Sequence, residues 1–486
     1  MTNLSKTKYC NAIQCFKILW LDTYKPNVKE EVSSESVMDN GNLVHETARD
    51  LLKEHKLIKY NDNLEVMLDE TKEYLKQNNI VIAEASFKYQ NNFCSVDLFK
   101  KDGNNIEIYE VKGATKVKDI FIDDLSYQVY ILTQLGYHIN KAYIVTLNSN
   151  YVREKELDLN QLFNINDYTL EVRKKHDYVE KMIKDINECM LNKNEINIDI
   201  DDHCFKPYMC PFFNYCTKDL PKPNVFDIRR IFNSKKIKLY KEGLISFRDL
   251  LVAKLDNISK QQIEYELYDK EDYIDKKKIK DFLNTLSMPL YFLDFETFQM
   301  PIPKYCNTSA YEQIPFQYSL HYIENNKLYH KEFLAEAGID PRRKLAENLV
   351  RDIPIDVCTL AYNMSFEKNV IKKLAEIYPD LSNHLMNIYY NIKDLMIPFK
   401  ERYYYTKAMQ GSYSIKYVLP ALFPNDESLD YHNLDLIHNG SEAMNAYANL
   451  EGKSKEELEH IRERLLKYCE LDTYAMVKIY QKLKKL

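Results

Sequence analysis

Glycine and proline are scarce in this sequence: its 486 residues include 9 glycines and 15 prolines. That scarcity excludes collagen-like, low-complexity and glycine-loop-rich architectures. No apolar run approaches the roughly 20 residues that span a bilayer, so we expect no membrane segment. The sequence also lacks a GxxxxGK[ST] motif. We therefore expect no ATP-driven motor of the P-loop type.

The ten cysteines are too few and too unevenly spaced for a disulfide scaffold, so we expect a reducing, cytoplasmic setting. Hydrophobic residues make up 45% of the chain and charged residues 29%, which is enough for a sizeable core in two or three domains. The net charge of −6 excludes a polybasic binding protein. It leaves open an enzyme that holds nucleic acid in a local groove.

Three blocks follow one another along the chain. Residues 1–219 begin with a helical pattern and contain several alternating apolar strands. Residues 220–285 are Lys-rich and helical, and we interpret them as a connector rather than a DNA-binding helical module. Residues 286–486 start with the apolar strand MPLYFLDFET and end in a helix. We therefore expect an α/β fold.

Two acidic residues and a lysine lie on consecutive strands of the first block. Asp97 lies towards the end of the strand FCSVDLF, whereas Glu110 and Lys112 are two residues apart in IEIYEVKGA and so share a strand face. The DGNN turn at 102–105 predicts a hairpin that brings Asp97 beside Glu110. Two carboxylates so close repel each other unless a divalent cation such as Mg²⁺ or Mn²⁺ binds between them. The alternative is an exposed edge strand with a surface ion pair.

Further polar residues accompany this hairpin in a fixed order. A histidine lies upstream in GNLVHETARDLL, Glu84 precedes the hairpin, and a glutamine follows in DDLSYQVYIL. This order resembles the RecB-type branch of the PD-(D/E)XK nucleases. The resemblance implies a restriction-endonuclease-like core. It also implies His45, Asp97 and Glu110 as metal ligands, with Lys112 and Gln128 as catalytic residues.

Three evenly spaced cysteines close the first block in HCFKPYMCPFFNYC, and a fourth lies far upstream in QCFKILWL. Four cysteines can hold a [4Fe–4S] cluster or structural zinc. The pattern resembles the iron–sulfur RecB-like nucleases associated with CRISPR adaptation, although Phe16 stands where proline is common and the first spacing is wider. Zinc and Cys10 stay open as the alternative metal and ligand. The resemblance implies these iron–sulfur ligands: Cys15, Cys204, Cys210 and Cys216.

The third block carries a second group of acids. LYFLDFET places Asp294 and Glu296 on one side of an otherwise apolar strand. An unpaired buried carboxylate costs several kcal/mol, which divalent ions could offset. Near the C-terminus, Tyr468 and Asp472 are four residues apart and so share one helical face.

With Asn363 and Glu367 of LAYNMSFEKNVI, these residues resemble the DEDD exonucleases of the ribonuclease H-like fold. Glu367 stands where that family usually has aspartate, and Asp394 is a second-tier candidate. The resemblance implies two-metal chemistry with Tyr468 positioning the attacking water. It also implies these metal ligands: Asp294, Glu296, Glu367 and Asp472.

The joint order of both halves resembles a bacterial family that fuses an iron–sulfur RecB-like nuclease to a DEDD-type exonuclease-like domain. We expect a metal-dependent nuclease acting on single-stranded DNA or on DNA with free ends, as an exonuclease. A helicase or a defence or repair protein is a possible partner, and we expect no membrane partner. One alternative is an RNA-processing exonuclease. The other is a nucleic-acid-binding or complex-assembly protein with one or both centres inactive.

Overall fold

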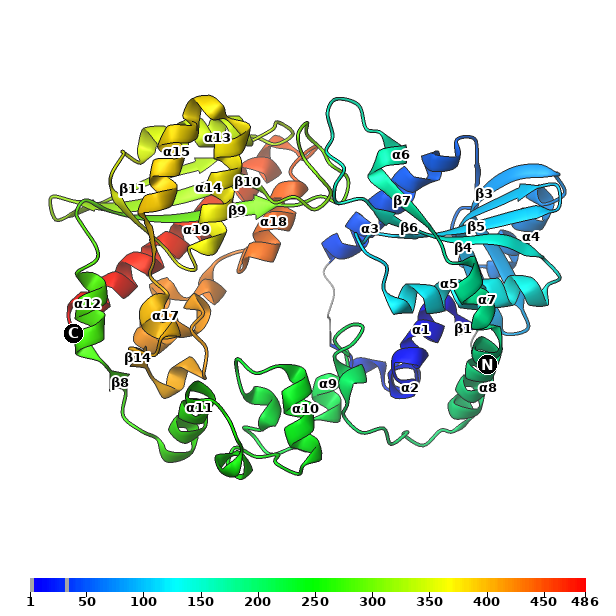
Figure 1. The fold of residues 1–486 in the computed structure, drawn as a ribbon, viewed down its shortest axis with the longest axis horizontal. Coiled ribbons are helices and arrows are strands. Elements are labelled where there is room, and N and C mark those ends of the chain that lie inside the picture. Colours follow the sequence, from blue (N-terminus) through cyan, green and yellow to red (C-terminus); the bar gives the residue numbers. More distant parts are fainter. Residues whose placement is uncertain (1–3, 31–34) are drawn as a thin grey trace. The chain divides into compact units, whose positions relative to one another are not determined.

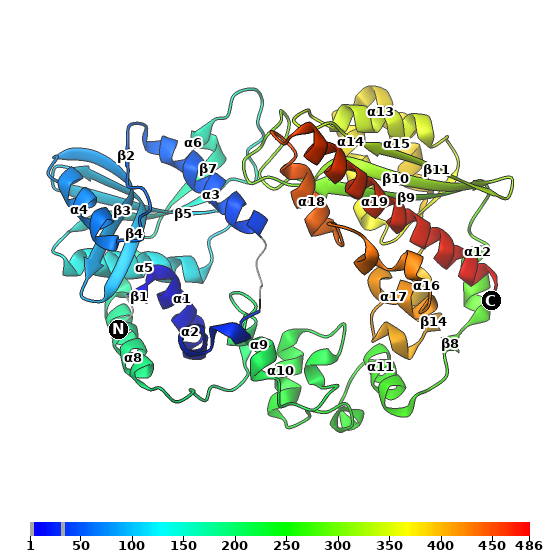
Figure 2. The ribbon, with the colours of Figure 1, turned by 180° about the vertical axis from the view of Figure 1, so that it is seen from behind.

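The computed structural model describes residues 4–30 and 35–486. Figure 1 and Figure 2 show the fold from opposite sides. Helices accompany sheets throughout, so the expected α/β class is confirmed. The chain forms two compact units: the first unit is Met1–Leu220 with Met300–Glu312, and the second unit is Pro221–Gln299 with Gln313–Leu486.

The three-block division of the sequence stays a prediction. The contacts group the Lys-rich segment 220–285 mainly with the second unit, and residues 300–312 with the first unit. The Lys-rich segment has a core of its own, with Val225, Phe247 and Ile263 among its buried residues. It is therefore more than a solvated connector.

The first unit contains a seven-stranded sheet. Its strands are β1 (Leu4–Ser5), β2 (Lys56–Leu57), β3 (Asn79–Tyr89), β4 (Asn92–Asp102), β5 (Asn105–Lys112), β6 (Ile139–Leu147) and β7 (Phe163–Asp167). Its α-helices are α1 (Lys6–Gln14), α2 (Phe16–Tyr24), α3 (Glu35–Arg49), α4 (Leu64–Tyr74), α5 (Asp119–Gln134), α6 (Leu159–Leu162), α7 (Thr169–Lys174), α8 (His176–Leu191) and α9 (Phe213–Cys216).

The strand order of this sheet is β2-β3-β4-β5-β6-β7, and β1 pairs with β4. Strands β3, β4 and β5 are antiparallel neighbours, whereas β6 runs parallel to β5. A parallel neighbour needs a crossover, and α5 supplies it. Because side chains alternate along β5, Ile108 joins the core that contains α5, and Val111 joins the core that contains Val44 of α3. The sheet is thus covered on both faces.

The second unit contains a five-stranded sheet and a two-stranded sheet. Its strands are β8 (Tyr273–Ile274), β9 (Leu290–Phe298), β10 (Ile314–Glu324), β11 (Lys327–Leu334), β12 (Cys358–Ala361), β13 (Ile392–Asp394) and β14 (Tyr404–Tyr405). Its α-helices are α10 (Asn233–Lys241), α11 (Asn257–Tyr268), α12 (Lys276–Leu283), α13 (Arg342–Asp352), α14 (Ser365–Ile377), α15 (Pro379–Asn391), α16 (Ile397–Lys400), α17 (Ile415–Leu422), α18 (Gly440–Ala448) and α19 (Lys455–Lys484).

The five strands are ordered β11-β10-β9-β12-β13. Strands β9, β10 and β11 are antiparallel neighbours, and β12 and β13 run parallel to β9. Phe295 and Tyr318 face the core formed with α13, α14 and α15. Their neighbours Asp294 and Ser319 point to the opposite face, where α19 packs on β9 and β10. One face of the sheet is therefore an apolar core, and the other carries polar groups beneath a long helix.

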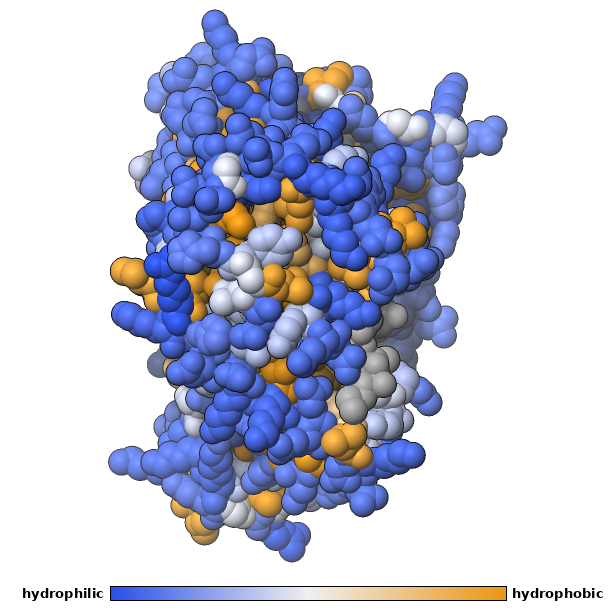
Figure 3. All heavy atoms as spheres, turned by 90° about the vertical axis from the view of Figure 1, so that its right-hand side faces the viewer, coloured by the Kyte–Doolittle hydropathy of each residue, from blue (hydrophilic) through white to orange (hydrophobic). Residues whose placement is uncertain are grey.

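Among residues 4–30 and 35–486, none of the helices combines the length and the apolar character that a membrane span requires. Hydrophilic residues cover most of the face shown in Figure 3, with smaller hydrophobic patches between them.

Candidate functional site

The first candidate centre lies at strands β4 and β5 of the first unit. Asp97 and Glu110 are buried there, with 4% and 1% of their surface exposed. Leu98 lies opposite Tyr109 in the antiparallel register, which places Asp97 and Glu110 one position further along the two strands. The backbone N–H of Val111 donates to Asp97 Oδ2 at 2.7 Å. The hairpin thus brings the two predicted carboxylates together.

Lys112 and Gln128 both contact Glu110. Lys112 Nζ donates to Glu110 Oε1 at 2.6 Å, and Gln128 Nε2 donates to Glu110 Oε2 at 2.7 Å. Both side chains also donate to Asp124 of α5, at 2.6 and 3.1 Å. Burial alone would raise the pKa of Glu110, but Lys112 and Lys6 outweigh it and hold that pKa below its usual range. Burial and the charge of Glu110 raise the pKa of Asp124 to about 6.

Lys6, the first residue of α1, reaches both strand carboxylates. Its Nζ lies 3.1 Å from Asp97 Oδ1 and 3.1 and 3.2 Å from the two carboxylate oxygens of Glu110. One ammonium group therefore lies between the carboxylates, where the sequence predicts a divalent cation. Because an ammonium group and a metal ion repel each other, a cation bound there must displace Lys6.

Replacing Lys6 by Met is expected to tighten Mn²⁺ binding at the first centre roughly tenfold or more. The variant removes a charge whose repulsion of a divalent cation at about 4 Å is worth about 2–8 kcal/mol, depending on the effective dielectric constant. Mn²⁺ binding is measured by calorimetry in an Asp294→Asn background, which removes the second centre described below. Lys100→Met, which breaks an ion pair with Glu107 elsewhere on the sheet, is the control. Unchanged or weaker binding in Lys6→Met would contradict the expectation.

His45 of α3 and Glu84 of β3 lie beside Asp97. One ligand atom from each of these three residues lies within 4.8 Å of the others, and His45 Nδ1 is 3.7 Å from Asp97 Oδ1. Arg49 and Ser95 hydrogen-bond the Glu84 carboxylate at 3.4 and 3.3 Å. Burial and the neighbouring charge of Asp97 raise the pKa of Glu84. Two carboxylates and an imidazole thus lie close enough to bind one divalent ion.

The four predicted cluster cysteines line one small pocket of the first unit, with a volume of about 10 Å³: Cys15, Cys204, Cys210 and Cys216. Burial is the main cause that raises the pKa of each thiol. Gln14 Nε2 donates to the backbone carbonyls of His203 and Tyr208, both at 2.8 Å, and so ties the N-terminal helices to the cysteine loop. Four sulfur donors around one hollow fit an iron–sulfur cluster or zinc.

Cys10, the alternative cluster ligand, has different neighbours. It packs against the core of the first sheet, and its pKa is raised by burial and by the charge of Asp124. The positive charge of Lys112 offsets part of this rise in the pKa of the Cys10 thiol. Cys10 thus lies near the first candidate centre, and it is absent from the residues that line the cysteine pocket.

The second candidate centre lies in the second unit, between β9 and α19. One oxygen from each of Asp294, Glu296 and Asp472 lies within 4.8 Å of the others. Burial and then the charges of Asp472 and Glu296 raise the pKa of Asp294 well above its usual value. Burial raises the pKa of Asp472 to about 6. Glu296 is buried, and Asp294 and Asp472 are half-buried. Three acids so close together are typical of a site for divalent cations.

Glu367 lies in the first turn of α14, and 2% of its surface is exposed. Its charge contributes to the raised pKa of both Asp294 and Glu296. Burial raises the pKa of Glu367 itself to about 8. Glu367 Oε2 is buried, and among the described residues it has no hydrogen-bond partner. An acceptor in that position is free to bind a cation. Asp394 instead accepts the backbone N–H of Asn363 at 3.0 Å, which is a structural role.

Two tyrosines flank Asp472. Tyr468 lies one helical turn earlier on α19 and is buried. Burial and the charge of Asp472 raise the pKa of its hydroxyl. Tyr431, which no motif indicated, donates its hydroxyl to Asp472 Oδ1 at 2.6 Å. Tyr431 therefore orients the carboxylate from outside the group of acids.

Tyr431→Phe is expected to weaken Mn²⁺ binding at the second centre by roughly 10–100-fold, because a ligand loses the hydrogen bond that orients it. Calorimetry in an Asp97→Asn background isolates this centre. Tyr318→Phe is the matched control, since Tyr318 also donates to a carboxylate, Asp352, at 2.7 Å but on the other face of the sheet. Equal affinities in the two variants would contradict an orienting role for Tyr431.

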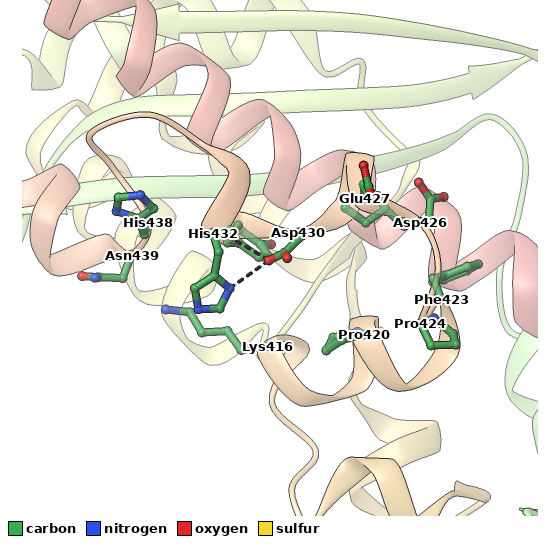
Figure 4. A pocket seen from close by; sticks show the side chains of 12 residues that line it. Lys416, Pro420, Phe423, Pro424, Asp426, Glu427, Asp430, His432, His438 and Asn439 are labelled. Carbon is green, nitrogen blue, oxygen red and sulfur yellow. Dashed lines mark hydrogen bonds and ion pairs between the residues drawn. The ribbon is translucent and has the colours of Figure 1, made fainter.

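A pocket of about 540 Å³ opens beside the second centre, and Tyr431 is part of its wall. Figure 4 shows Lys416 of α17 and His432 among the side chains that line it, with His432 bound to Asp430. Burial raises the pKa of both Glu296 and Asp472, and the charge of Lys416 offsets part of that rise. The pocket wall thus carries one lysine, two histidines and three carboxylates next to the second centre.

Three contributors to the two centres were missed in the sequence: Asp124, Lys6 and Tyr431. Asp124 could have been found from the sequence, because it lies four residues before Gln128 on a helix that is mostly apolar and buried. No sequence pattern points to Lys6 or Tyr431, because both reach their centres from distant segments of the chain.

Comparisons with known proteins bear on the second unit. Residues 291–414 match the family model of a domain of unknown function, DUF2779. The match includes Asp294, Glu296 and Glu367, but ends before Tyr468 and Asp472. No curated protein matches the chain. The chain is thus similar to DUF2779 over less than half of its length.

Proposed function

We propose that this protein is a divalent-metal-dependent nuclease with two active centres that hydrolyses phosphodiester bonds in DNA, as an exonuclease on single strands or free ends. The observation that carries the proposal is the close group of Asp294, Glu296 and Asp472, of which Glu296 is buried and the other two are half-buried. Like charges so close together destabilise the fold unless cations offset them.

The strand order β11-β10-β9-β12-β13 supports a ribonuclease H-like reading of the second unit. The acids lie on the first strand of that sheet, on the helix after β12 and on the final helix, as in the DEDD exonucleases that the sequence resembles. Asp294, Glu296, Glu367 and Asp472 would hold two metal ions, which activate water and stabilise the leaving oxygen. Tyr468 would position that water. Lys416 would contact substrate phosphate at the pocket rim.

The β3–β4–β5–α5–β6 succession supports a PD-(D/E)XK reading of the first unit. His45, Asp97 and Glu110 would hold a metal ion, with Glu84 as a further carboxylate beside them. Lys112 would orient the attacking water and offset phosphate charge. Gln128, which donates to Glu110 and Asp124, would position these two carboxylates.

A competing reading is a nucleic-acid-binding or assembly protein with inactive centres. Two observations favour it: Glu367 stands where the DEDD pattern has aspartate, and Lys6 lies between Asp97 and Glu110. RNA is the alternative substrate, because DEDD sites process both polymers. The chain has no P-loop motif, so unwinding of duplex DNA would need a helicase or another defence or repair partner.

The test is a digestion time course with Mn²⁺ on 5′-labelled single-stranded DNA and RNA of the same sequence. Wild type should produce a ladder of shortened DNA, and EDTA should abolish it. The double variant Asp97→Asn/Asp294→Asn is the blank that removes both centres. Cleavage of RNA alone would favour the RNA-processing alternative. No cleavage of either polymer by the metal-loaded protein would favour the binding protein.

The cysteine pocket is proposed to hold a [4Fe–4S] cluster, with zinc as the alternative; the cytoplasm is the compartment that this assumes, because thiolate ligands need a reducing medium. Anaerobically purified protein is expected to be brown. Cys210→Ser should lose most of the iron and the colour, because it removes one of four ligands, whereas Cys189→Ser on α8 should keep both. Iron analysis and visible absorption provide the measurement. Colourless protein with about one zinc per chain would contradict the iron assignment.

A further inference from the structure

A second group of metal-binding side chains lies on the same sheet face of the second unit, outside the acids described above. It consists of His321 on β10, His330 on β11 and Glu470 on α19. One ligand atom from each lies within 4.8 Å of the others. His321 lies directly opposite His330 in the antiparallel register, and their rings stack with centroids 4.4 Å apart. Neither the nuclease motifs nor the proposed chemistry uses these residues.

Hydrogen bonds fix both imidazoles through one nitrogen each. His321 Nδ1 lies 2.8 Å from Thr473 Oγ1, and His330 Nε2 lies 2.9 Å from Ser319 Oγ. Ser319 Oγ lies 2.6 Å from Thr473 Oγ1, and the Thr473 hydroxyl donates to the backbone carbonyl of Glu470 at 3.1 Å. One assignment of protons satisfies all four of these hydrogen bonds: each imidazole donates to the hydroxyl beside it, and Ser319 donates to Thr473. The opposite ring nitrogens, His321 Nε2 and His330 Nδ1, then keep their lone pairs.

The remaining nitrogen of His330 is directed at the carboxylate. His330 Nδ1 lies 3.9 Å from Glu470 Oε1, which is too long for a hydrogen bond. Neutral imidazoles held by a hydrogen bond at the far nitrogen are the usual ligand form in metal sites. Glu332, two residues after His330 on β11, adds a second carboxylate that interacts with His330 and Glu470.

We propose that His321, His330 and Glu470 form a binding site for a divalent transition-metal ion of the Zn²⁺ class. Two imidazoles and one carboxylate are a ligand set that binds zinc and leaves one coordination position open. Glu470 is half exposed, so ions can enter from solvent. The site links β10 and β11 to α19, the helix that carries Asp472. This inference stands on its own residues and does not depend on the proposed nuclease activity.

The test is Zn²⁺ binding by the full-length protein, measured by calorimetry in excess Mg²⁺ so that the carboxylate centres are occupied. Glu470→Gln and His330→Asn are each expected to lose one equivalent of zinc, or to bind it at least about 100-fold more weakly. His460→Asn, an exposed histidine on the same helix, should bind as wild type does. Thr473→Val, which removes only the supporting hydroxyl, should weaken binding by about 10–100-fold.

Co²⁺ separates this site from the cysteine pocket. Thiolate-bound Co²⁺ absorbs strongly in the near ultraviolet, whereas a site of imidazole and carboxylate gives only weak visible bands. The variants should therefore lose visible bands and keep any thiolate absorption. Equal zinc binding in wild type, Glu470→Gln and His330→Asn would overturn the proposal. So would a loss in His330→Asn alone. Glu470 is exposed enough for its variant to fold, which keeps the test decisive if the histidine variants do not fold.

Discussion

Asp294→Asn is expected to reduce cleavage by the second centre roughly 10³-fold or more. The charges of Asp472, Glu296 and Glu367 all raise the pKa of Asp294, so its replacement removes a proposed metal ligand from the middle of the group. A bound metal ion supplies several kcal/mol of transition-state stabilisation, and about 4 kcal/mol corresponds to a factor of 10³ in rate. The measurement is the rate of product formation from 5′-labelled DNA at saturating Mn²⁺. Asp380→Asn, an exposed aspartate bound to Arg343, is the control.

The same substitution is expected to stabilise the metal-free protein. Because burial and neighbouring acids raise the pKa of Asp294, folding the charged form costs free energy that asparagine avoids. In EDTA the variant should melt above wild type, by about 2–4 °C for each kcal/mol gained. In Mn²⁺ the order should reverse, because only wild type gains stability from bound ions. A variant that loses activity and also melts lower in EDTA would point to damaged folding instead.

Asp97→Asn is expected to reduce cleavage by the first centre by a similar factor of roughly 10³. Asparagine keeps an oxygen that can accept the N–H of Val111, so the hairpin should persist. It removes the charge that faces Lys6 and His45, and with it a proposed metal ligand. Asp69→Asn, an exposed aspartate paired with Lys72 on α4, is the control.

The products distinguish the two centres. A ladder that disappears in Asp294→Asn and persists in Asp97→Asn would assign exonuclease activity to the second unit. The reverse would assign it to the first unit. Persistence in both single variants with loss in the double variant would mean that both centres cut the same substrate. If the wild-type rate survives in the double variant, these acids are not the catalytic residues.

How far the sequence predicts each centre depends on where its residues lie along the chain. Glu110 and Lys112 share a strand face because strands alternate with a period of two, and Asp97 follows from the hairpin turn. Tyr468 and Asp472 share a helical face for an equally local reason. Each of these relationships spans a few residues, so the pattern alone predicts it.

Longer-range partners needed the tertiary structure. Lys6 reaches Glu110 from 104 positions away, and Tyr431 reaches Asp472 from 41 positions away. Neither belongs to a periodic pattern, because a side chain brought in by chain crossing leaves no trace in local spacing. Cys10 illustrates the same limit, since its spacing allowed it as a cluster ligand but packing places it beside the first sheet.

The pair His321 and His330 shows most clearly which contacts the sequence predicts and which need the tertiary structure. The sequence places His321 on one strand and His330 on the next, nine residues later, without indicating that they meet. The tight turn after Glu324 sets a register in which the two rings lie opposite each other, and α19 then adds Glu470 and Thr473. The sequence by itself thus determined the α/β class and the acids that local periodicity aligns. Only the tertiary structure decided which distant cations, hydroxyls and imidazoles surround them, because those contacts depend on strand register and helix packing.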